Sequence, residues 1–423
     1  MNVIMKFGGT SVADAEAMGR VLGIVRRQLA DSPRDKPPVV VVSAMSKVTD
    51  RLIETGRLAG EGDAEGAARL LGELLERHLQ VAGGLIGSDG ALAGLAQTLR
   101  GDFSGLTGEI RRLAAAGEVP PRAHDELVAM GELASSRIVA TAFAAHGLPA
   151  VWVDARSVLV TDDEHMAAIP DMAATCQRTS EHVGTRRAAG QVAVLGGFIG
   201  ATAGGVTTTL GRGGSDYSAA IFGACLEVDE IQIWTDVDGM LTADPRVVAE
   251  PRLVPQLSFD EASELAYFGA KVLHPSTILP AVAKNIPVRI LNSRRPEVSG
   301  TMVTAQGRAN TGTLTALACK RGVTVVNITS SRMLMAHGFL RRLFEVFERF
   351  KTPVDVVTTS EVSVSVTVDN ARRLDDIVSN LLNFARAGGN DDASLDIPKV
   401  VGDVLSLVEH QLEKAREIGR AHV

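Results

Sequence analysis

The sequence predicts an α/β protein whose main sheet is largely parallel and is covered by helices on both faces. Short apolar runs at residues 3–5, 39–42, 150–153, 192–195 and 230–234 alternate with segments of helical spacing. The chain also has 42 glycines among 423 residues but only 4% aromatic residues, which favours closely packed α/β units. Because ligands of such sheets bind at the carboxyl ends of the strands, the turns after residues 5, 42, 195 and 234 are expected to converge.

The first run ends in a glycine turn, Lys6-Phe7-Gly8-Gly9-Thr10-Ser11, and a helix is expected from about residue 14. Two glycines let the backbone approach an oxyanion, and the helix start offers unpaired N–H groups. Lys6 adds a positive charge beside them. The turn therefore predicts a phosphate site, although its spacing is not that of a Walker A loop. An ordinary tight turn after a strand is the alternative.

The second run, residues 39–42, is wholly apolar and predicts a strand buried in a parallel sheet. A polar turn at 43–49 follows it. Leucines recur at helical spacing between residues 51 and 122, so this stretch is expected to form helices that pack on one another. Glu132 lies near an expected helix start and, taken alone, is typical of a surface residue.

A second glycine loop, Leu210-Gly211-Arg212-Gly213-Gly214-Ser215-Asp216, precedes a helix expected at about residue 218. The guanidinium of Arg212 is suited to two-point binding of a carboxylate or phosphate. Asp216 could instead serve only as a helix N-cap. Against that alternative, the neighbouring Arg212 needs a partner.

Further polar residues follow the run at 230–234. Carboxylates at a strand end, as in Thr235-Asp236-Val237-Asp238-Gly239, can bind a ribose or hold Mg²⁺ through water. An Asx-type turn is the alternative. Asp244-Pro245-Arg246 comes soon after, and the segment 268–275 contains Lys271 and His274, of which a lone histidine is more often structural.

The pattern changes after residue 300. Residues 323–328, 353–358 and 362–368 read as strands, and residues 338–350 as an amphipathic helix. These elements predict a small β-α-β-β unit of a second domain type.

Composition excludes several classes of protein. A formal net charge of −7 without a basic stripe argues against nucleic-acid binding. No apolar run approaches about 20 residues, so no membrane span is expected. Met1 leads directly into an expected strand, so a signal peptide is not expected. The cysteines Cys176, Cys225 and Cys319 lack the spacing typical of metal ligands. They are interpreted as buried thiols, and the chain is expected to be cytoplasmic.

The chain resembles aspartokinases from residue 1 to about 380. The resemblance is carried, in sequence and in order, by the two glycine loops, the 234–239 and 244–246 motifs and the 268–275 segment. The resemblance implies a three-layer αβα amino-acid kinase domain at residues 1–300. A ferredoxin-like ACT regulatory domain is expected at 314–380, with 314–320 as the first strand of an incomplete second ACT domain. Residues 381–423 are expected to form an atypical tail, with a helix from 395 onward.

The resemblance implies transfer of the γ-phosphoryl group of MgATP to the β-carboxylate of L-aspartate. This reaction is the first step toward lysine, threonine and methionine. Lys6, Arg212 and Asp216 match the catalytic positions, with Lys6 on the transferring group and Arg212 on a substrate carboxylate. The substrate positions also include Thr10, Ser11, Thr49, Glu132, which faces the ammonium, Gly213, Gly214 and Ser215.

The nucleotide positions implied by the resemblance are Lys6, Gly8, Gly9, Thr235, Asp236, Leu241, Arg246, Lys271 and Val272. Leu241 stands where some members have a tyrosine, so it offers apolar surface but no hydroxyl. The residues agree with the chemistry, because a carboxylate nucleophile is ionised at pH 7 and needs alignment and charge stabilisation rather than a general base.

In the β-α-β-β unit, the positions that match an amino-acid effector site are Met333, Gly338, Phe339, Leu340, Asp355, Thr359, Ser360 and Glu361. Lysine, threonine or both are the implied effectors, in a homodimer or higher homo-oligomer. A unit that only dimerises is the alternative. For the whole chain, the alternatives are another amino-acid kinase, acting on glutamate, carbamate or a nucleotide, and a non-catalytic amino-acid sensor.

Overall fold

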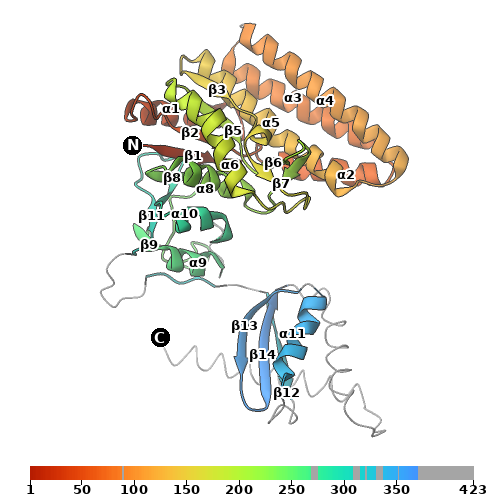
Figure 1. The fold of residues 1–423 in the computed structure, drawn as a ribbon, viewed down its shortest axis with the longest axis vertical. Coiled ribbons are helices and arrows are strands. Elements are labelled where there is room, and N and C mark those ends of the chain that lie inside the picture. Colours follow the sequence, from red (N-terminus) through yellow and green to blue (C-terminus); the bar gives the residue numbers. More distant parts are fainter. Residues whose placement is uncertain are drawn as a thin grey trace. The chain divides into compact units, whose positions relative to one another are not determined.

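The structure, a computed structural model, describes residues 1–87, 90–267, 275–307, 315–319, 322–329, 337–350 and 352–369. The chain divides into two compact units, Met1–Cys319 and Lys320–Val423. Each unit is described by itself (Figure 1).

The first unit is built on an eight-stranded sheet, and the predicted α/β fold is confirmed. In spatial order the strands are β3 (Ala150–Trp152), β5 (Val192–Gly196), β2 (Val39–Val42), β1 (Val3–Phe7), β8 (Glu230–Thr235), β10 (Val288–Asn292), β11 (Thr301–Thr304) and β9 (Gln256–Ser258). The strands from β3 to β10 are parallel, and only the β10–β11 pairing is antiparallel. The five apolar runs of the sequence coincide with β1, β2, β3, β5 and β8.

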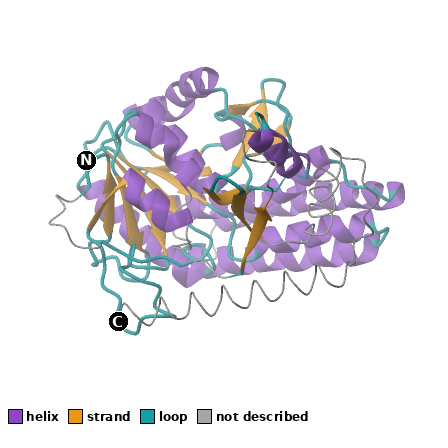
Figure 2. Cartoon of the chain, turned by 90° about the horizontal axis from the view of Figure 1, so that it is seen from below, coloured by secondary structure: helices purple, strands orange, loops and turns teal. Residues whose placement is uncertain are grey.

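Helices cover both faces of this sheet (Figure 2). Strand β1 shows why, because its side chains alternate between two cores. Val3, Met5 and Phe7 face the core with helices α1 (Ala15–Ala30), α2 (Val48–Gly60), α3 (Ala64–Ile86), α4 (Gly90–Ala116) and α5 (Pro121–Ala145). Ile4 faces the core with α8 (Gly214–Leu226) and α10 (Leu279–Ala283). The remaining helical segments of this unit are α6 (Met172–Arg178), α7 (Thr185–Ala188), α9 (Phe259–Tyr267) and the short η1 (Ala155–Ser157), η2 (Thr179–Gly184) and η3 (Pro275–Ile278).

A second, three-stranded sheet was not predicted from the sequence. It consists of β4 (Val160–Thr161), β6 (Ile199–Thr202) and β7 (Thr207–Thr209), in the order β4-β6-β7. Its strands are too short to give a clear alternation of apolar and polar residues. Strand β7 ends directly before the second glycine loop, so this small sheet positions that loop.

Helix α5 has the length and apolar composition of a membrane span, but 83% of its most apolar window is buried inside the protein. It packs against α2, α3 and α4 as well as β3, β5 and β7. Its apolar surface is therefore accounted for by the protein core.

The cysteines correct one expectation. Cys176 in α6 and Cys225 in α8 are joined by a disulfide, with their Cα atoms 4.8 Å apart, and Cys319 is exposed. The two bonded residues are 49 positions apart in the sequence. The sequence spacing of the cysteines did not reveal this disulfide, because the packing of α6 against α8 brings the two residues together.

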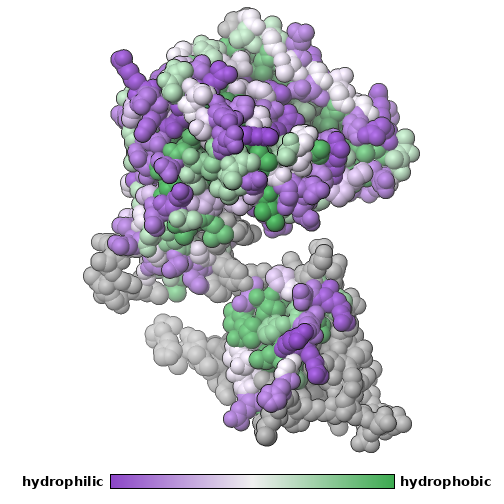
Figure 3. Space-filling view, viewed as in Figure 1, coloured by the Kyte–Doolittle hydropathy of each residue, from purple (hydrophilic) through white to green (hydrophobic). Residues whose placement is uncertain are grey.

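The second unit has the predicted β-α-β-β order, with β12 (Val323–Thr329), α11 (Phe339–Arg349), β13 (Val354–Thr359) and β14 (Ser363–Asp369). Strand β14 lies between the other two and is antiparallel to both. Leu343, Val346 and Phe347 of α11 pack on Val364, Val366 and Val368 of β14. Figure 3 shows hydrophobic surface on this unit, whose exposed large apolar residues are Val325, Leu340, Val356, Val357 and Val362.

The segment expected to be a strand at 314–320 differs from the prediction. Its described residues, 315–319, form no strand. Instead the Leu317 N–H donates to the Thr242 carbonyl at 2.8 Å, and the Thr315 hydroxyl lies 3.3 Å from a Glu261 carboxylate oxygen. This stretch therefore packs on the first unit. The predicted tail at 381–423 lies outside the described residues.

Candidate active site

The carboxyl ends of four parallel strands meet at one edge of the main sheet, as predicted. Backbone hydrogen bonds join them in a row: Gly197 N–H to Val42 O at 2.9 Å, Ser43 N–H to Phe7 O at 3.1 Å, and Gly8 N–H to Trp234 O at 3.0 Å. Strand β1 lies between β2 and β8, where the strand order reverses. That position is the usual ligand crevice of an open α/β sheet.

The first glycine turn is held between the ends of β2 and β8. The Ser46 N–H donates to Gly9 O at 3.1 Å, and the Ser11 N–H donates to Gly8 O at 2.9 Å. A Cβ on Gly9 would lie 3.0 Å from the Ala44 carbonyl oxygen, so a side chain there would push the two turns apart. Thr10 is half-buried on the same turn. The glycines therefore allow a close approach of backbone to backbone at the site.

Lys6 and Asp216 form an ion pair across the site. Lys6 follows Ile4 on the α8 face of β1 by strand alternation, and its Nζ lies 2.6 Å from Asp216 Oδ1. Only 11% and 14% of the two side chains are exposed. The N-cap of α8 is Gly213, with φ of 71°, so the N-cap alternative for Asp216 is wrong. Asp216 instead lies in the first turn, where the helix dipole favours a negative charge.

The second glycine loop presents Arg212 to solvent. Its guanidinium has no hydrogen-bond or ion-pair partner among the described residues. Gly211 and Gly213 both have positive φ, 75° and 71°, which fits a tight loop. The loop is closely packed underneath, because a Cβ on Gly197 would lie 2.8 Å from the Cα of Ser215. An unpaired cation thus stands on a well-supported loop beside the Lys6–Asp216 pair.

Glu132 lies in the middle of α5 rather than near a helix start, and it is buried rather than at the surface. It is 3% exposed, and its Oε1 accepts the Ala44 N–H at 3.0 Å. Its Oε2 is buried and has no hydrogen-bond partner in the described chain. Burial raises the pKa of this carboxyl to about 8, although the Ala44 N–H and the charge of Lys6 act in the opposite direction. An orphan acceptor of this kind suits a ligand ammonium.

The other expected substrate and nucleotide positions lie on neighbouring turns. Thr49 is the second residue of α2 and is half-buried. The Thr235 hydroxyl lies 3.3 Å from the exposed Asp236 carboxylate. Arg246 is largely exposed, and its Nη2 lies 2.7 Å from Asp244 Oδ2. Leu241 is half-buried and forms an isolated β-bridge with Leu253. Lys271, Val272 and His274 lie outside the described residues.

Two residues at this edge were missed. The Ser293 hydroxyl lies 2.8 Å from the Ser11 hydroxyl and donates to the Thr235 carbonyl at 3.1 Å, so it links the first turn to the end of β8. Phe198, with φ of 67°, receives the Leu210 N–H on its carbonyl at 2.9 Å. The run Val288–Asn292 before Ser293 and the Gly196-Gly197 pair before Phe198 were usable signals for a strand end and a turn.

Asp238 already bonds other residues of the protein through both of its carboxylate oxygens. Its Oδ1 accepts the Asn292 side-chain amide at 2.7 Å, and its other oxygen pairs with Arg295. Within the described ranges, no group of three or more His, Cys, Asp or Glu side chains could hold a metal ion. Asp216, in the first turn of α8 and paired with Lys6, and Asp236, directly after β8, fit a cation that is carried mainly by phosphate oxygens and water.

The expected effector residues of the second unit form two groups and one outlier. Thr359, Ser360 and Glu361 lie at the β13–β14 turn, where Thr359 pairs with Val364. Gly338, Phe339 and Leu340 form the start of α11. Because α11 ends shortly before β13 begins and runs along the sheet (Figure 1), its start points toward the same end as that turn.

Asp355 lies near the opposite end of β13, beside the Val354↔Val368 pair. Met333 lies outside the described residues. The structure therefore brings six of the eight predicted effector residues toward one end of the sheet and leaves Asp355 apart from them.

Comparison with known proteins identifies the family. A sequence model of the amino acid kinase family matches residues 1–292. The chain is 38% identical over 405 residues to "Aspartokinase 3, chloroplastic" of Arabidopsis thaliana, covering 91% of this chain and 69% of that protein. It is 38% identical over 373 residues to "Lysine-sensitive aspartokinase 3" of Escherichia coli (strain K12), covering 87% and 78%.

Among solved structures, E. coli aspartokinase III in complex with aspartate and ADP is similar to this chain. The TM-score is 0.76 at 35% identity, and the match covers 90% of this chain and 83% of that one. The chain therefore belongs to the amino acid kinase family and, within it, to the aspartokinases.

Proposed function

We propose that this chain transfers the γ-phosphoryl group of MgATP to the β-carboxylate of L-aspartate. The observation that carries the proposal is the Lys6–Asp216 ion pair at the crevice between β1 and β8. Arg212, which has no partner among the described residues, and the buried Glu132, whose Oε2 has no described hydrogen-bond partner, flank this pair. Two of the similar proteins support the choice of substrate, since one is named an aspartokinase and the other is solved with aspartate and ADP.

Each described group has a task that fits this reaction. Glu132 receives the ammonium of aspartate, and Arg212 pairs with a carboxylate of the same molecule. Lys6 and the N–H groups of Gly9 and Thr10, which make no hydrogen bond among the described residues, would meet the charge that develops on the transferring group and stabilise the transition state. Asp216 orients Lys6. The β-carboxylate attacks as an anion, so no base is required.

Mg²⁺ is part of the proposal because it neutralises phosphate charge when it arrives with ATP. Asp216 and Asp236 are the described carboxylates that would reach it, directly or through water. Thr235 and Asp236 at the end of β8 would lie beside the nucleotide, and Leu241 and Arg246 follow in the next segment. Lys271 and Val272 complete the proposed nucleotide set.

Trapping the acyl phosphate with hydroxylamine tests the function. With MgATP and L-aspartate, the wild type is expected to form aspartyl hydroxamate. Lys6→Ala should lose at least about 100-fold in rate, since it removes a charged donor to the transition state. Lys36→Ala, at an exposed lysine, is the matched control and should keep full activity. A hydroxamate from glutamate or carbamate but not aspartate would favour another amino-acid kinase. Aspartate binding without any turnover would favour a sensor.

We further propose that the second unit binds an amino-acid effector, with lysine as the first candidate. One similar protein is named lysine-sensitive, and the 338–340 and 359–361 groups lie toward one end of the sheet. Lysine is expected to inhibit the wild type, and Glu361→Gln should weaken that inhibition at least fivefold. Glu348→Gln, at an exposed position of α11, should leave it unchanged. Equal inhibition of both variants would exclude Glu361 from the effector site.

A homodimer or higher homo-oligomer is also proposed, on the exposed apolar residues Val325, Val356 and Val357 of the second unit. Light scattering at micromolar concentration measures this directly. A cytoplasmic location remains a proposal too. The Cys176–Cys225 disulfide does not favour it, because most such bonds persist in oxidising compartments.

A further inference from the structure

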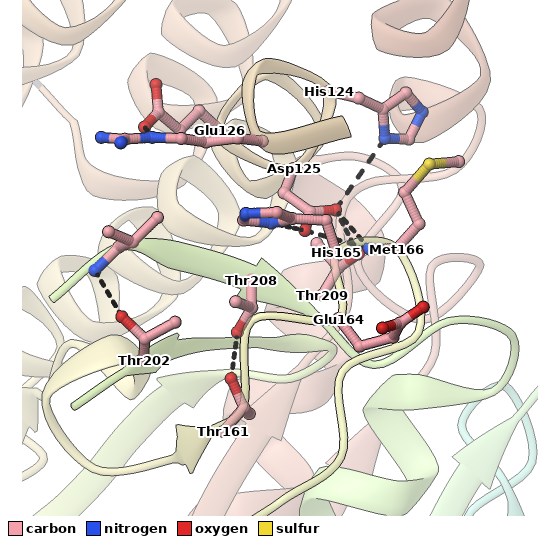
Figure 4. A network of polar contacts seen from close by, with 12 residues as sticks. His124, Asp125, Glu126, Thr161, Glu164, His165, Met166, Thr202, Thr208 and Thr209 are labelled. Carbon is pink, nitrogen blue, oxygen red and sulfur yellow. Dashed lines mark hydrogen bonds and ion pairs between the residues drawn. The ribbon is translucent and has the colours of Figure 1, made fainter. Parts of the chain in front are cut away.

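Asp125, in the first turns of α5, is a buried carboxylate that the proposed reaction does not use. Its side chain is fully buried, yet it accepts from three neighbouring groups (Figure 4). The Thr209 hydroxyl donates at 2.6 Å, the His165 Nδ1 lies at 2.8 Å, and the Met166 N–H donates at 3.1 Å and 3.2 Å to the two oxygens. A buried carboxylate with this many donors organises what surrounds it.

The donors around Asp125 favour the ionised form of its carboxyl. Burial alone raises the pKa of its carboxyl, but the interactions with His124, Thr209, His165 and the Met166 N–H outweigh burial and lower the pKa below its ordinary value. A buried anion is stable only while its donors stay in place. Conversely, each donor is fixed by a charge-assisted hydrogen bond, which is stronger than one between neutral groups.

The donors of Asp125 belong to the two segments that support the second glycine loop. Thr209 is the last residue of β7 and directly precedes Leu210. Met166 belongs to the connection between β4 and α6, and its carbonyl oxygen would lie 3.1 Å from a Cβ on Gly211. The Ala168 N–H donates to the Thr209 carbonyl at 2.9 Å. These contacts fasten the Met166 segment and β7 to each other directly beneath the loop of Arg212.

The Met166 segment depends on these bonds for its position. Met166 has a φ of 70°, an uncommon backbone conformation for a residue other than glycine. The neighbouring His165 borders a cavity of about 530 Å³ that is also lined by Thr161, Asp162 and Thr202. On the side of His165 this connection borders open space, so its hydrogen bonds to Asp125 add to what holds it against Gly211.

Asp125 also lies on the same face of α5 as Glu132. The two residues are seven positions apart, which is close to two helical turns, or about 10 Å along the axis. The same helix thus carries Glu132, which is expected to bind the substrate ammonium, and Asp125, which bonds the segments that support the loop of Arg212 and Asp216.

We propose that Asp125 is a positioning residue for aspartate binding, which fixes the 210–216 loop, and with it Arg212, at a set distance from Glu132. This inference rests on the proposed function. It assigns Asp125 no contact with substrate. It predicts an effect on the binding of aspartate rather than on that of the nucleotide, whose expected residues Thr235 and Asp236 lie at the end of β8.

Kinetics of three variants test the proposal. Asp125→Asn keeps the shape of the side chain but turns an amide donor toward the Met166 N–H. The KM for aspartate is therefore expected to rise at least tenfold, while the KM for ATP stays within twofold. Thr209→Val removes one donor and should raise the aspartate KM about threefold. Thr179→Val is the matched control, because Thr179 is equally buried and, among the described residues, its hydroxyl bonds only the Thr175 carbonyl one turn earlier, at the α6–η2 junction. It should change neither constant.

Hydrogen exchange provides a readout that does not need activity. In Asp125→Asn, amides of residues 207–217 should exchange at least tenfold faster than in the wild type, while those of β8 should not change. Unaltered exchange at 207–217, or equal rises in the KM of aspartate and ATP, would overturn the positioning role. If Asp125→Asn does not fold, Thr209→Val decides by the same two criteria. A wild type without phosphoryl transfer would refute the proposed function, and exchange would still decide the positioning of the loop.

Discussion

At the scale of single residues, burial decides how Glu132 behaves. The carboxyl has a pKa of about 8 and is therefore mostly protonated at pH 7 in the free protein. A ligand ammonium placed at Oε2 favours the ionised form, so binding of aspartate is expected to release a proton. The affinity for aspartate should rise about tenfold between pH 7 and pH 8.5, as the ionised fraction of Glu132 grows.

Calorimetry in two buffers of different ionisation enthalpy measures that proton release. Glu132→Gln should bind aspartate more weakly and without pH dependence in this window. Binding by the wild type without proton release would contradict the assigned role of Glu132.

His78 makes a second residue-scale prediction. It is fully buried between α3 and α4, its Nδ1 lies 2.6 Å from the Leu74 carbonyl, and burial lowers the pKa of its ring to about 4. The unfolded chain takes up this proton near pH 6.5, whereas the folded protein does not until about pH 4. Stability is therefore unaffected above pH 6.5 and falls as the pH drops from 6.5 toward 4, by about 2 kcal/mol at pH 5.

Urea unfolding at pH 7.5 and pH 5 checks this loss. In His78→Leu the difference between the two pH values should shrink by that amount, while His182→Gln, at an exposed histidine, should behave as the wild type. An unchanged pH difference in His78→Leu would show that other groups cause the acid sensitivity.

At the scale of elements, the Cys176–Cys225 bond ties α6 to α8, the helix whose first turn carries Asp216. Reduction is expected to lower the free energy of unfolding by about 2–4 kcal/mol, because the cross-link restricts the unfolded chain. Thiol titration of the denatured, unreduced protein should find one thiol, Cys319, and three after reduction. Cys319→Ser should not change stability, and three thiols before reduction would disprove the bond.

At the scale of the whole molecule, the catalytic and regulatory tasks are expected to be separable. Both large hydrophobic cores are made entirely of residues of the first unit, and the second unit has its own small core. A chain ending at Cys319 should therefore fold and bind ADP within threefold of the full chain, but lose any response to lysine. Circular dichroism and calorimetry check both statements. A shortened chain that still responds to lysine would place the effector site in the first unit.

Much of the fold followed from the sequence because its signals are local. Wholly apolar runs such as 39–42 predicted buried parallel strands, and the glycine turns after them predicted the edge where Gly8, Gly197 and Trp234 meet. Short strands gave no such signal, so the β4-β6-β7 sheet was missed. Residues 314–320 were assigned to a strand, but the described residues 315–319 form none.

The sequence by itself determined which residues are chemically able to act, because residue type and the turn that carries it are local properties. Tertiary structure alone decided their partners. Lys6 meets Asp216, and Ser11 meets Ser293 from 282 positions away. Burial, which depends on the packing of distant elements, made Glu132 an orphan acceptor and Asp125 the anchor of a loop. Pairing and burial are set by contacts between segments far apart in the chain, and local patterns do not record them.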